Sequence, residues 1–256
     1  MTRILRWLFL SLLAFAPTVS AQDVPTIAAA SDLKFALEEV AKAYEQTSGQ
    51  KLRLVFGASG NLTRQIAQGA PFDLFLSADE QYVFDLHKQG LTVDEGVLYA
   101  IGHVVLFVPK GSPIKVDAKL EDLKRAIDDG RLKKLSIANP EHAPYGRAAR
   151  AVLQSAGLWD KVQDKLVLGE NVSQAAQYAA SGATQAGLFA LSLAVTPNYR
   201  QAGSYVVLPE AWHPPLRQRM VLLKRAGEGA RRFQAYLQQP AARGILKTYG
   251  FALPGE

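Results

Sequence analysis

The chain has 256 residues, of which 48% are hydrophobic and 20% are charged. This is an ordinary globular composition, and the length suits one large domain or two modest lobes with a real core. The sequence contains no cysteine, which excludes disulfides and thiolate metal sites.

The N-terminal segment has the pattern of a secretory signal peptide. Arg3 and Arg6 form a short basic region, residues 7–16 are almost wholly apolar, and small residues lead to Ala21. We predict cleavage after Ala21, which makes residues 1–21 a signal peptide and places the mature chain in the bacterial periplasm; an uncleaved membrane anchor is the alternative. Loss of the two arginines lowers the formal net charge from +6 to +4. Such a weak excess of positive charge argues against nucleic acid as a partner.

Strands and helices alternate through the first ninety residues. Short apolar runs predict strands, and apolar residues at helical spacing predict helices. The predicted order is a strand at 25–29, a helix at 33–47, a strand at 52–56, a helix from 62 to 69, a strand at 72–77 and a helix at 79–88. This βαβα order indicates a mostly parallel sheet covered by helices.

The second half repeats the theme. The predicted strands lie at 103–109, 135–138, 166–168, 186–190, 205–208 and 220–223, and the predicted helices at 120–127, 145–156, 174–181, 228–238 and 241–249. The pattern predicts two α/β lobes, with the chain crossing between them near 101–103 and 209–215. We therefore expect lobe I to comprise 22–102 plus 211–256 and lobe II to comprise 103–210, with a ligand cleft between them.

Four loops each end a strand and open a helix with small or hydroxyl residues. They are Ala30-Ser31-Asp32, Ala58-Ser59-Gly60, Pro144-Tyr145-Gly146 and Asn171-Val172-Ser173. Ligands bind at the carboxyl ends of strands in open parallel sheets, and the first N–H groups of a helix lack internal partners and lie at its positive end. Several such helix starts at one point would bind an anion without Lys or Arg. Ordinary N-capping is the alternative reading of any single loop.

Six segments of the chain carry a family resemblance. They are AAAS (28–31), FGASGNL (56–62), QGAPFDLFLSADE (68–80), ANPEHAPYG (138–146), ENV (170–172) and KTYGF (247–251). In this order, over nearly the whole mature chain, they resemble the periplasmic molybdate-binding proteins of ABC transporters.

The resemblance implies a type-II periplasmic binding protein fold, in which each lobe is a mostly parallel sheet flanked by helices. It implies a monomeric solute receptor rather than an enzyme, which captures molybdate or tungstate and passes it to an ABC transporter permease in the inner membrane. Molybdenum enters only as the bound oxyanion, and no other cofactor is expected. Ser31 and Ser59 would donate hydroxyl and backbone N–H groups, and Tyr145 and Val172 would donate backbone N–H groups.

Two positions make the ligand assignment less direct. Some family members supply a tyrosine hydroxyl where this chain has Ala190, so we expect the Tyr145 hydroxyl to reach the anion instead. Asp32 adjoins Ser31, and a carboxylate that accepts hydrogen bonds would favour protonated phosphate over fully deprotonated molybdate. We expect Asp32 to cap the helix that begins at Leu33, with its carboxylate turned outward. A receptor of the same fold for sulfate or phosphate remains the alternative.

Two other functions compete with solute transport. Residues 57–61 begin like the G-x-S-x-G elbow of a serine hydrolase, with Ser59 as nucleophile, but the fifth residue is Asn61. Four dispersed histidines (His87, His103, His142 and His213) are the available bases, and none has the spacing of a zinc motif. A sensor or chaperone of the same fold for another anion is the other alternative.

Overall fold

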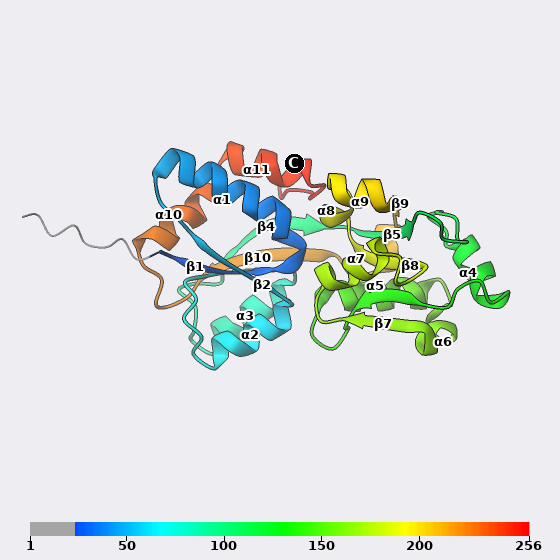
Figure 1. Ribbon diagram of the computed structural model, residues 1–256. Helices are drawn as coiled ribbons and strands as arrows, with labels where there is room; N and C mark the ends of the chain where they lie inside the picture. The colour runs from blue at the N-terminus through cyan, green and yellow to red at the C-terminus, as the bar shows by residue number, and fades with distance from the viewer. Residues whose placement is uncertain (1–23, 256) are drawn as a thin grey trace, which may run out of the picture.

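The computed structural model of the protein describes residues 24–255. The predicted signal peptide and its cleavage site lie outside these residues. Two five-stranded sheets form the centres of two lobes that lie side by side (Figure 1). No helix in the described part of the chain combines the length and apolarity needed to cross a bilayer.

The first sheet has the strand order β2-β1-β3-β10-β4. Its strands are β1 (Thr26–Ala30), β2 (Arg53–Gly57), β3 (Leu74–Ser77), β4 (Val97–Gly102) and β10 (Leu216–Leu222). β1 pairs in parallel with β2 and β3, whereas β10 is antiparallel to both β3 and β4. Four strands therefore run in one direction and β10 runs against them.

The second sheet repeats this arrangement in the order β7-β6-β8-β5-β9. Its strands are β5 (Val104–Pro109), β6 (Leu135–Ala138), β7 (Leu166–Gly169), β8 (Ala186–Ala190) and β9 (Gly203–Val207). β6 is parallel to β7 and β8, and β5 is antiparallel to β8 and β9. The prediction of two mostly parallel α/β lobes is confirmed, each with one reversed strand.

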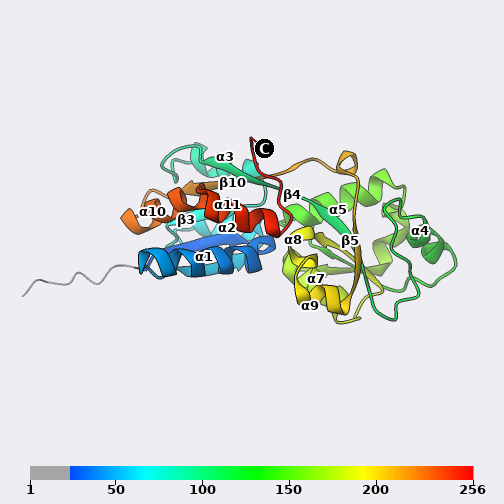
Figure 2. The same ribbon diagram turned by 90° about the horizontal axis from the view of Figure 1, so that it is seen from above.

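Helices cover both faces of the first sheet (Figures 1 and 2). Residues of β1 alternate between the faces: Ile27 and Ala29 pack in one cluster with α1 (Lys34–Ser48), α10 (Glu228–Leu237) and α11 (Pro240–Thr248). Ala28 packs in a second cluster with α2 (Ser59–Ala67) and α3 (Glu80–Lys88). This alternation is the period of two expected for a strand buried on both faces.

The second sheet has a single continuous core. The helices of this lobe are α4 (Glu121–Asp128), α5 (Pro144–Ser155), α6 (Trp159–Val162), α7 (Val172–Ala180), α8 (Leu191–Ala194) and α9 (Pro197–Ala202). The described residues also form three short 3-10 turns: η1 (Ser31–Leu33), η2 (Gln163–Lys165) and η3 (Glu210–Trp212). Helices α5 and α7 both contact β6 and β8, which fixes their N-terminal ends near the carboxyl ends of those strands.

The chain passes between the sheets twice. His103 alone separates β4 in the first sheet from β5 in the second, and residues 208–215 connect β9 back to β10. The two reversed strands, β5 and β10, are thus the strands that leave each crossing. The crossings agree with the positions expected from the sequence, while the full lobe boundaries stay a prediction.

Some elements differ from the sequence prediction. Strand β4 and the short helices α6, α8 and α9 were not predicted, and α2 begins at Ser59 rather than Leu62. The segment between the predicted strand at 52–56 and the predicted helix from 62 is therefore not a loop throughout, because Ser59, Gly60 and Asn61 already belong to α2. Glycine and asparagine are poor helix formers, which hid this first turn.

Candidate functional site

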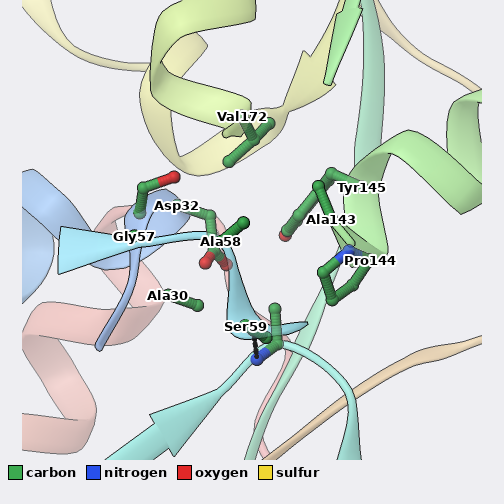
Figure 3. A pocket seen from close by; sticks show the side chains of 11 residues that line it. Ala30, Asp32, Gly57, Ala58, Ser59, Ala143, Pro144, Tyr145 and Val172 are labelled. Carbon is green, nitrogen blue, oxygen red and sulfur yellow. Dashed lines mark hydrogen bonds between the residues drawn. The ribbon is translucent and has the colours of Figure 1, made fainter. Parts of the chain in front are cut away.

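The four predicted loops meet at one pocket between the lobes (Figure 3). The space between these residues is about 180 Å³, part of which is open to solvent. It is lined by Ala30, Ser31, Asp32, Gly57, Ala58, Ser59, Ala78, Ala143, Pro144, Tyr145 and Val172. The sequence thus predicted Ser31, Ser59, Tyr145 and Val172 at one site, and the structure brings all four together.

Three helices open onto the pocket without a side-chain cap. The residues that precede η1, α2 and α5 are Ala30, Ala58 and Ala143, and none of them makes a side-chain cap hydrogen bond. By contrast, Asp79 caps α3 by accepting from the Gln81 N–H at 2.9 Å. Alanine is a poor N-cap, so these three helix starts leave N–H groups for a bound ligand. Ordinary N-capping therefore fails to explain these three loops.

The fourth helix start, that of α7, is capped. Asn171 accepts from the Gln174 N–H at 3.1 Å. Val172, the first residue of α7, still lines the pocket. The positive end of this helix therefore also faces the site.

The two serine hydroxyls already accept hydrogen bonds from the protein. Ser59 Oγ accepts from the Ala78 N–H at 3.0 Å, and Ser31 Oγ accepts from the Ser173 N–H at 3.4 Å. A hydroxyl has one proton to donate and rotates to suit its acceptor. With an acceptor position occupied on each oxygen, both O–H groups can donate to a ligand.

Tyr145 is 2% exposed and points from the start of α5 into the pocket (Figure 3). Its hydroxyl lies 3.4 Å from Gln218 Nε2 and packs so tightly against Gly102 that a Cβ there would clash with it. Burial raises the pKa of Tyr145 well above its ordinary value, and the neighbouring Asp32 adds to this. The phenol is therefore neutral and serves as a hydrogen-bond donor or acceptor.

Asp32 does not adopt the predicted position. It makes no cap hydrogen bond, and its side chain is buried (1% exposed) rather than turned outward. The reason is that η1 packs against α7 and α8 of the other lobe, and the carboxylate turns toward the buried Gln218 instead of toward solvent. Burial raises the pKa of Asp32 to about 6, against the opposing effect of the Gln218 hydrogen bond and of the neighbouring Tyr145 hydroxyl.

A buried polar chain beneath the pocket was missed from the sequence. Gln218 Nε2 donates to Asp32 Oδ2 at 2.6 Å, and the Tyr99 hydroxyl donates to Gln218 Oε1 at 2.8 Å. Gln218 lies on β10 with the inward positions Leu216 and Met220, all three buried. A polar residue in register with buried apolar ones was the signal available in the sequence.

Ala190 ends β8 opposite Val104 and is fully buried. It is not one of the residues that line the pocket. An alanine side chain has no hydroxyl, so Ala190 donates no side-chain hydrogen bond to the pocket.

The lobes are in direct contact around the pocket. Ser173 Oγ donates to Ser31 O and Ser192 Oγ donates to Asp32 O, each at 2.7 Å. The Gly60 N–H donates to His142 O at 3.0 Å. These bonds join η1 and α2 of lobe I to α7, α8 and the loop before α5 of lobe II. The structure is thus a closed form.

The histidines do not support a serine hydrolase. The ring of His142 is bonded to Glu170 O at 2.9 Å and braces its loop. The rings of the other three contact Thr92, Glu210 and Pro214. Ser59 therefore has no histidine base at its hydroxyl among the described residues. Across residues 24–255, no cluster of three His, Cys, Asp or Glu side chains suits a metal ion.

Two α/β lobes linked by two crossings, with a small pocket between them where helix starts converge, define a two-lobed solute-binding protein. Residues 25–252 match the family model of bacterial extracellular solute-binding proteins. The chain is 36% identical to the molybdate-binding protein ModA of Azotobacter vinelandii over 89% of each chain. It is 34% identical to the ModA of Rhodobacter capsulatus, over 84% of this chain and 82% of that one.

The solved structure of the Azotobacter vinelandii periplasmic molybdate-binding protein superposes with a TM-score of 0.82 at 30% identity, covering 90% of this chain and 99% of that one. The chain belongs to the bacterial extracellular solute-binding proteins and, among them, to the family of molybdate-binding proteins. The predicted fold class and the prediction of a solute receptor rather than an enzyme are confirmed by this membership.

Proposed function

We propose that this chain captures molybdate or tungstate outside the cytoplasm and delivers it to the permease of an ABC importer in the inner membrane. One observation carries the proposal: helix starts without caps and two serine hydroxyls converge on one pocket between the lobes. The names of the relatives, which bind molybdate, supply the identity of the anion.

The donor set suits a fully deprotonated tetrahedral dianion, which can only accept hydrogen bonds. Ser31 and Ser59 would donate hydroxyl and backbone N–H groups from lobe I, and Tyr145 and Val172 would donate backbone N–H groups from lobe II. Among the described residues, none of those lining the pocket is Lys, Arg or His. Helix starts therefore take the place of charged side chains.

Binding between the lobes supplies a transport mechanism. An anion held by both lobes makes more contacts in the closed form than in the open one, and a ligand shifts an equilibrium only by this difference in affinity. Closure would present a surface to the permease that the open form lacks. Residues 22–102 with 211–256 would move as one lobe and 103–210 as the other.

Delivery to the periplasm would follow from cleavage after Ala21. Mass spectrometry of the protein purified from a periplasmic extract tests this step, with Gln22 as the expected N-terminal residue. An N-terminus at Met1 in the membrane fraction would instead support the uncleaved anchor.

A thermal-shift panel of the mature protein tests the ligand. Molybdate and tungstate should raise the melting temperature, because a ligand at a thousandfold excess over its Kd adds about 4 kcal/mol of stability. Sulfate and phosphate at the same concentration are the comparison. Phosphate is the specific competitor, because Asp32 lines the pocket and could accept a hydrogen bond from it. A shift with phosphate or sulfate alone would overturn the assignment.

A further inference from the structure

The pocket contains one group that the donor set does not explain. Asp32 lines the pocket, and its carboxyl oxygen Oδ1 is buried without a hydrogen-bond partner. The other oxygen, Oδ2, accepts from Gln218 Nε2 at 2.6 Å. A buried polar atom without a partner is costly and calls for an explanation. Figure 3 shows the Asp32 and Tyr145 side chains, both of which line the pocket.

Among residues 24–255, the groups that face Asp32 carry no positive charge. From lobe I these are Gln218 on β10 and, behind it, Tyr99 on β4. From lobe II, Tyr145 on α5 faces the carboxyl and Ser192 on α8 bonds the backbone carbonyl of Asp32. The pKa of both tyrosines lies well above its ordinary value, chiefly through burial, so both stay neutral.

A deprotonated Asp32 would therefore face the bound dianion without a compensating cation. Like charges at short range in a poorly solvated site repel each other strongly. A proton on Asp32 removes this repulsion and also turns an acceptor into an O–H donor. The same proton gives the unpartnered oxygen a hydrogen-bond partner in the anion.

We propose that Asp32 is protonated when the oxyanion is bound, so that the closed protein captures one dianion together with one proton from solvent. The protonated Oδ1 then adds a donor to the set formed by the serines and the helix starts. This inference rests on the proposed function and sharpens it. It also resolves the apparent preference for phosphate, because a protonated carboxyl no longer requires a protonated ligand.

The sign of the pH dependence follows directly. Proton uptake on binding means that the affinity rises as the pH falls. In the unliganded closed form the pKa of Asp32 is about 6, and the dianion raises it further. Above this pKa the Kd should increase by up to about tenfold for each pH unit, because one proton is linked to binding. Below it the Kd should level off.

Isothermal titration calorimetry of the mature protein with molybdate at pH 7 tests the proposal. The binding enthalpy is measured in Pipes and in imidazole, and its dependence on the ionisation enthalpy of the buffer gives the number of protons taken up. We expect between half a proton and one proton for the wild type. Asp32→Asn mimics the protonated carboxyl, so it should take up none and should bind more tightly than the wild type at pH 8.

Two controls separate the causes. Asp164→Asn removes an exposed carboxylate that pairs with Lys165 and should leave the wild-type proton uptake unchanged. Any protonation of molybdate itself would persist in Asp32→Asn, so only the difference between the two proteins is assigned to Asp32. If the Asn variant does not fold, the pH dependence of the wild-type Kd decides, because the Kd should level off below the pKa of Asp32, about 6.

The outcomes are distinct. Molybdate binding without proton uptake, and with a Kd independent of pH from 5.5 to 8, overturns this inference and leaves the proposed function standing. Equal proton uptake in the wild type and in Asp32→Asn overturns it as well. The absence of any binding heat with molybdate or tungstate overturns the proposed function together with the inference.

Discussion

The Ser59 hydroxyl accepts a hydrogen bond within lobe I and also lies at the pocket. It accepts from the Ala78 N–H at 3.0 Å, just beyond the end of β3, while Ser59 itself is the first residue of α2. This bond ties α2 to the neighbouring strand and orients the hydroxyl. Its proton is then aimed away from Ala78, so orientation costs little when the anion binds.

Replacement of Ser59 by alanine should weaken molybdate binding. The variant loses a donor to a charged ligand, which is worth about 1.5–3 kcal/mol, so the Kd should rise by roughly ten- to a hundredfold. Isothermal titration calorimetry measures the change. Ser181→Ala, which removes an exposed hydroxyl bonded to Tyr178 O, is the control and should bind as the wild type does. A wild-type Kd for Ser59→Ala would exclude its hydroxyl from the site.

At the residue scale the sequence predicted the pocket but not what lies beneath it. Ser31, Ser59, Tyr145 and Val172 follow strands and open helices, and such corners meet at one edge of a parallel sheet. The burial of Asp32 depends on the contact of η1 with α7 and α8 of the other lobe. Its link to Gln218 depends on a strand 186 residues further along the chain. Neither the contact of η1 with the other lobe nor the hydrogen bond to Gln218 can be predicted from the residues next to Asp32 in the sequence.

At the scale of elements, the start of α5 is placed by close packing. Gly146 lies against the backbone carbonyl of Ala138 at the end of β6, so closely that a Cβ would clash with it. Glycine therefore lets α5 approach the sheet, and this places the Tyr145 N–H at the pocket. Pro144, at the first helical position, fits there because that position needs no N–H.

Helices α3 and α5 join the lobes at the rim of the pocket. Arg147 Nη2 lies 2.5 Å from Asp79 Oδ2, and Arg147 Nη1 donates to the Tyr82 hydroxyl at 2.7 Å. The guanidinium also stacks over the Tyr82 ring. These bonds exist only when the lobes are close, so they stabilise the closed form selectively.

Arg147→Ala should shift the protein toward its open form. Both partners of the ion pair are about one-third exposed, so solvent screening limits its contribution to about 1 kcal/mol or less. We expect the Kd for molybdate to rise by a few fold, mainly through faster dissociation, measured by stopped-flow fluorescence. Arg150→Ala is the matched control: Arg150 lies on the same helix but pairs with Glu141 of its own lobe. Equal effects of the two substitutions would contradict a role in closure.

The elements that the sequence missed also have a physical explanation. Strand β4 begins after Gly96 and ends one residue before β5. Because the two strands are nearly continuous, the sequence predicts only β5 as a strand, and the residues of β4 resemble the linker that precedes it. In β10, exposed Arg217 and half-buried Arg219 alternate with buried residues, which concealed its first half. Both missed segments lie where the chain crosses between the lobes. There, neighbouring residues pack in two different cores, so the hydrophobic pattern does not follow the period of one element.

At the scale of the whole molecule, the pocket divides its donors between two bodies. Ser31 and Ser59 belong to one lobe and Tyr145 and Val172 to the other, and the chain passes between the lobes near His103 and at residues 208–215. If one lobe held every donor, the anion would bind the open and closed forms equally and would shift neither. Division of the donors makes closure part of binding.

Molybdate should therefore reduce the radius of gyration of the mature protein, as measured by small-angle X-ray scattering. The closed form carries the interlobe bonds of Ser173, Ser192 and Arg147, and these contribute in full only when both lobes hold the anion. Chloride at equal ionic strength is the control and should leave the radius unchanged, because it cannot occupy four divided donors at once. Ser59→Ala should need more molybdate to reach the same closed radius, since its lobe I donors are fewer. A radius of gyration that stays constant while calorimetry reports saturation would mean that the lobes are already closed before the anion binds. The division of the donors between the lobes would then contribute to affinity but would not drive closure.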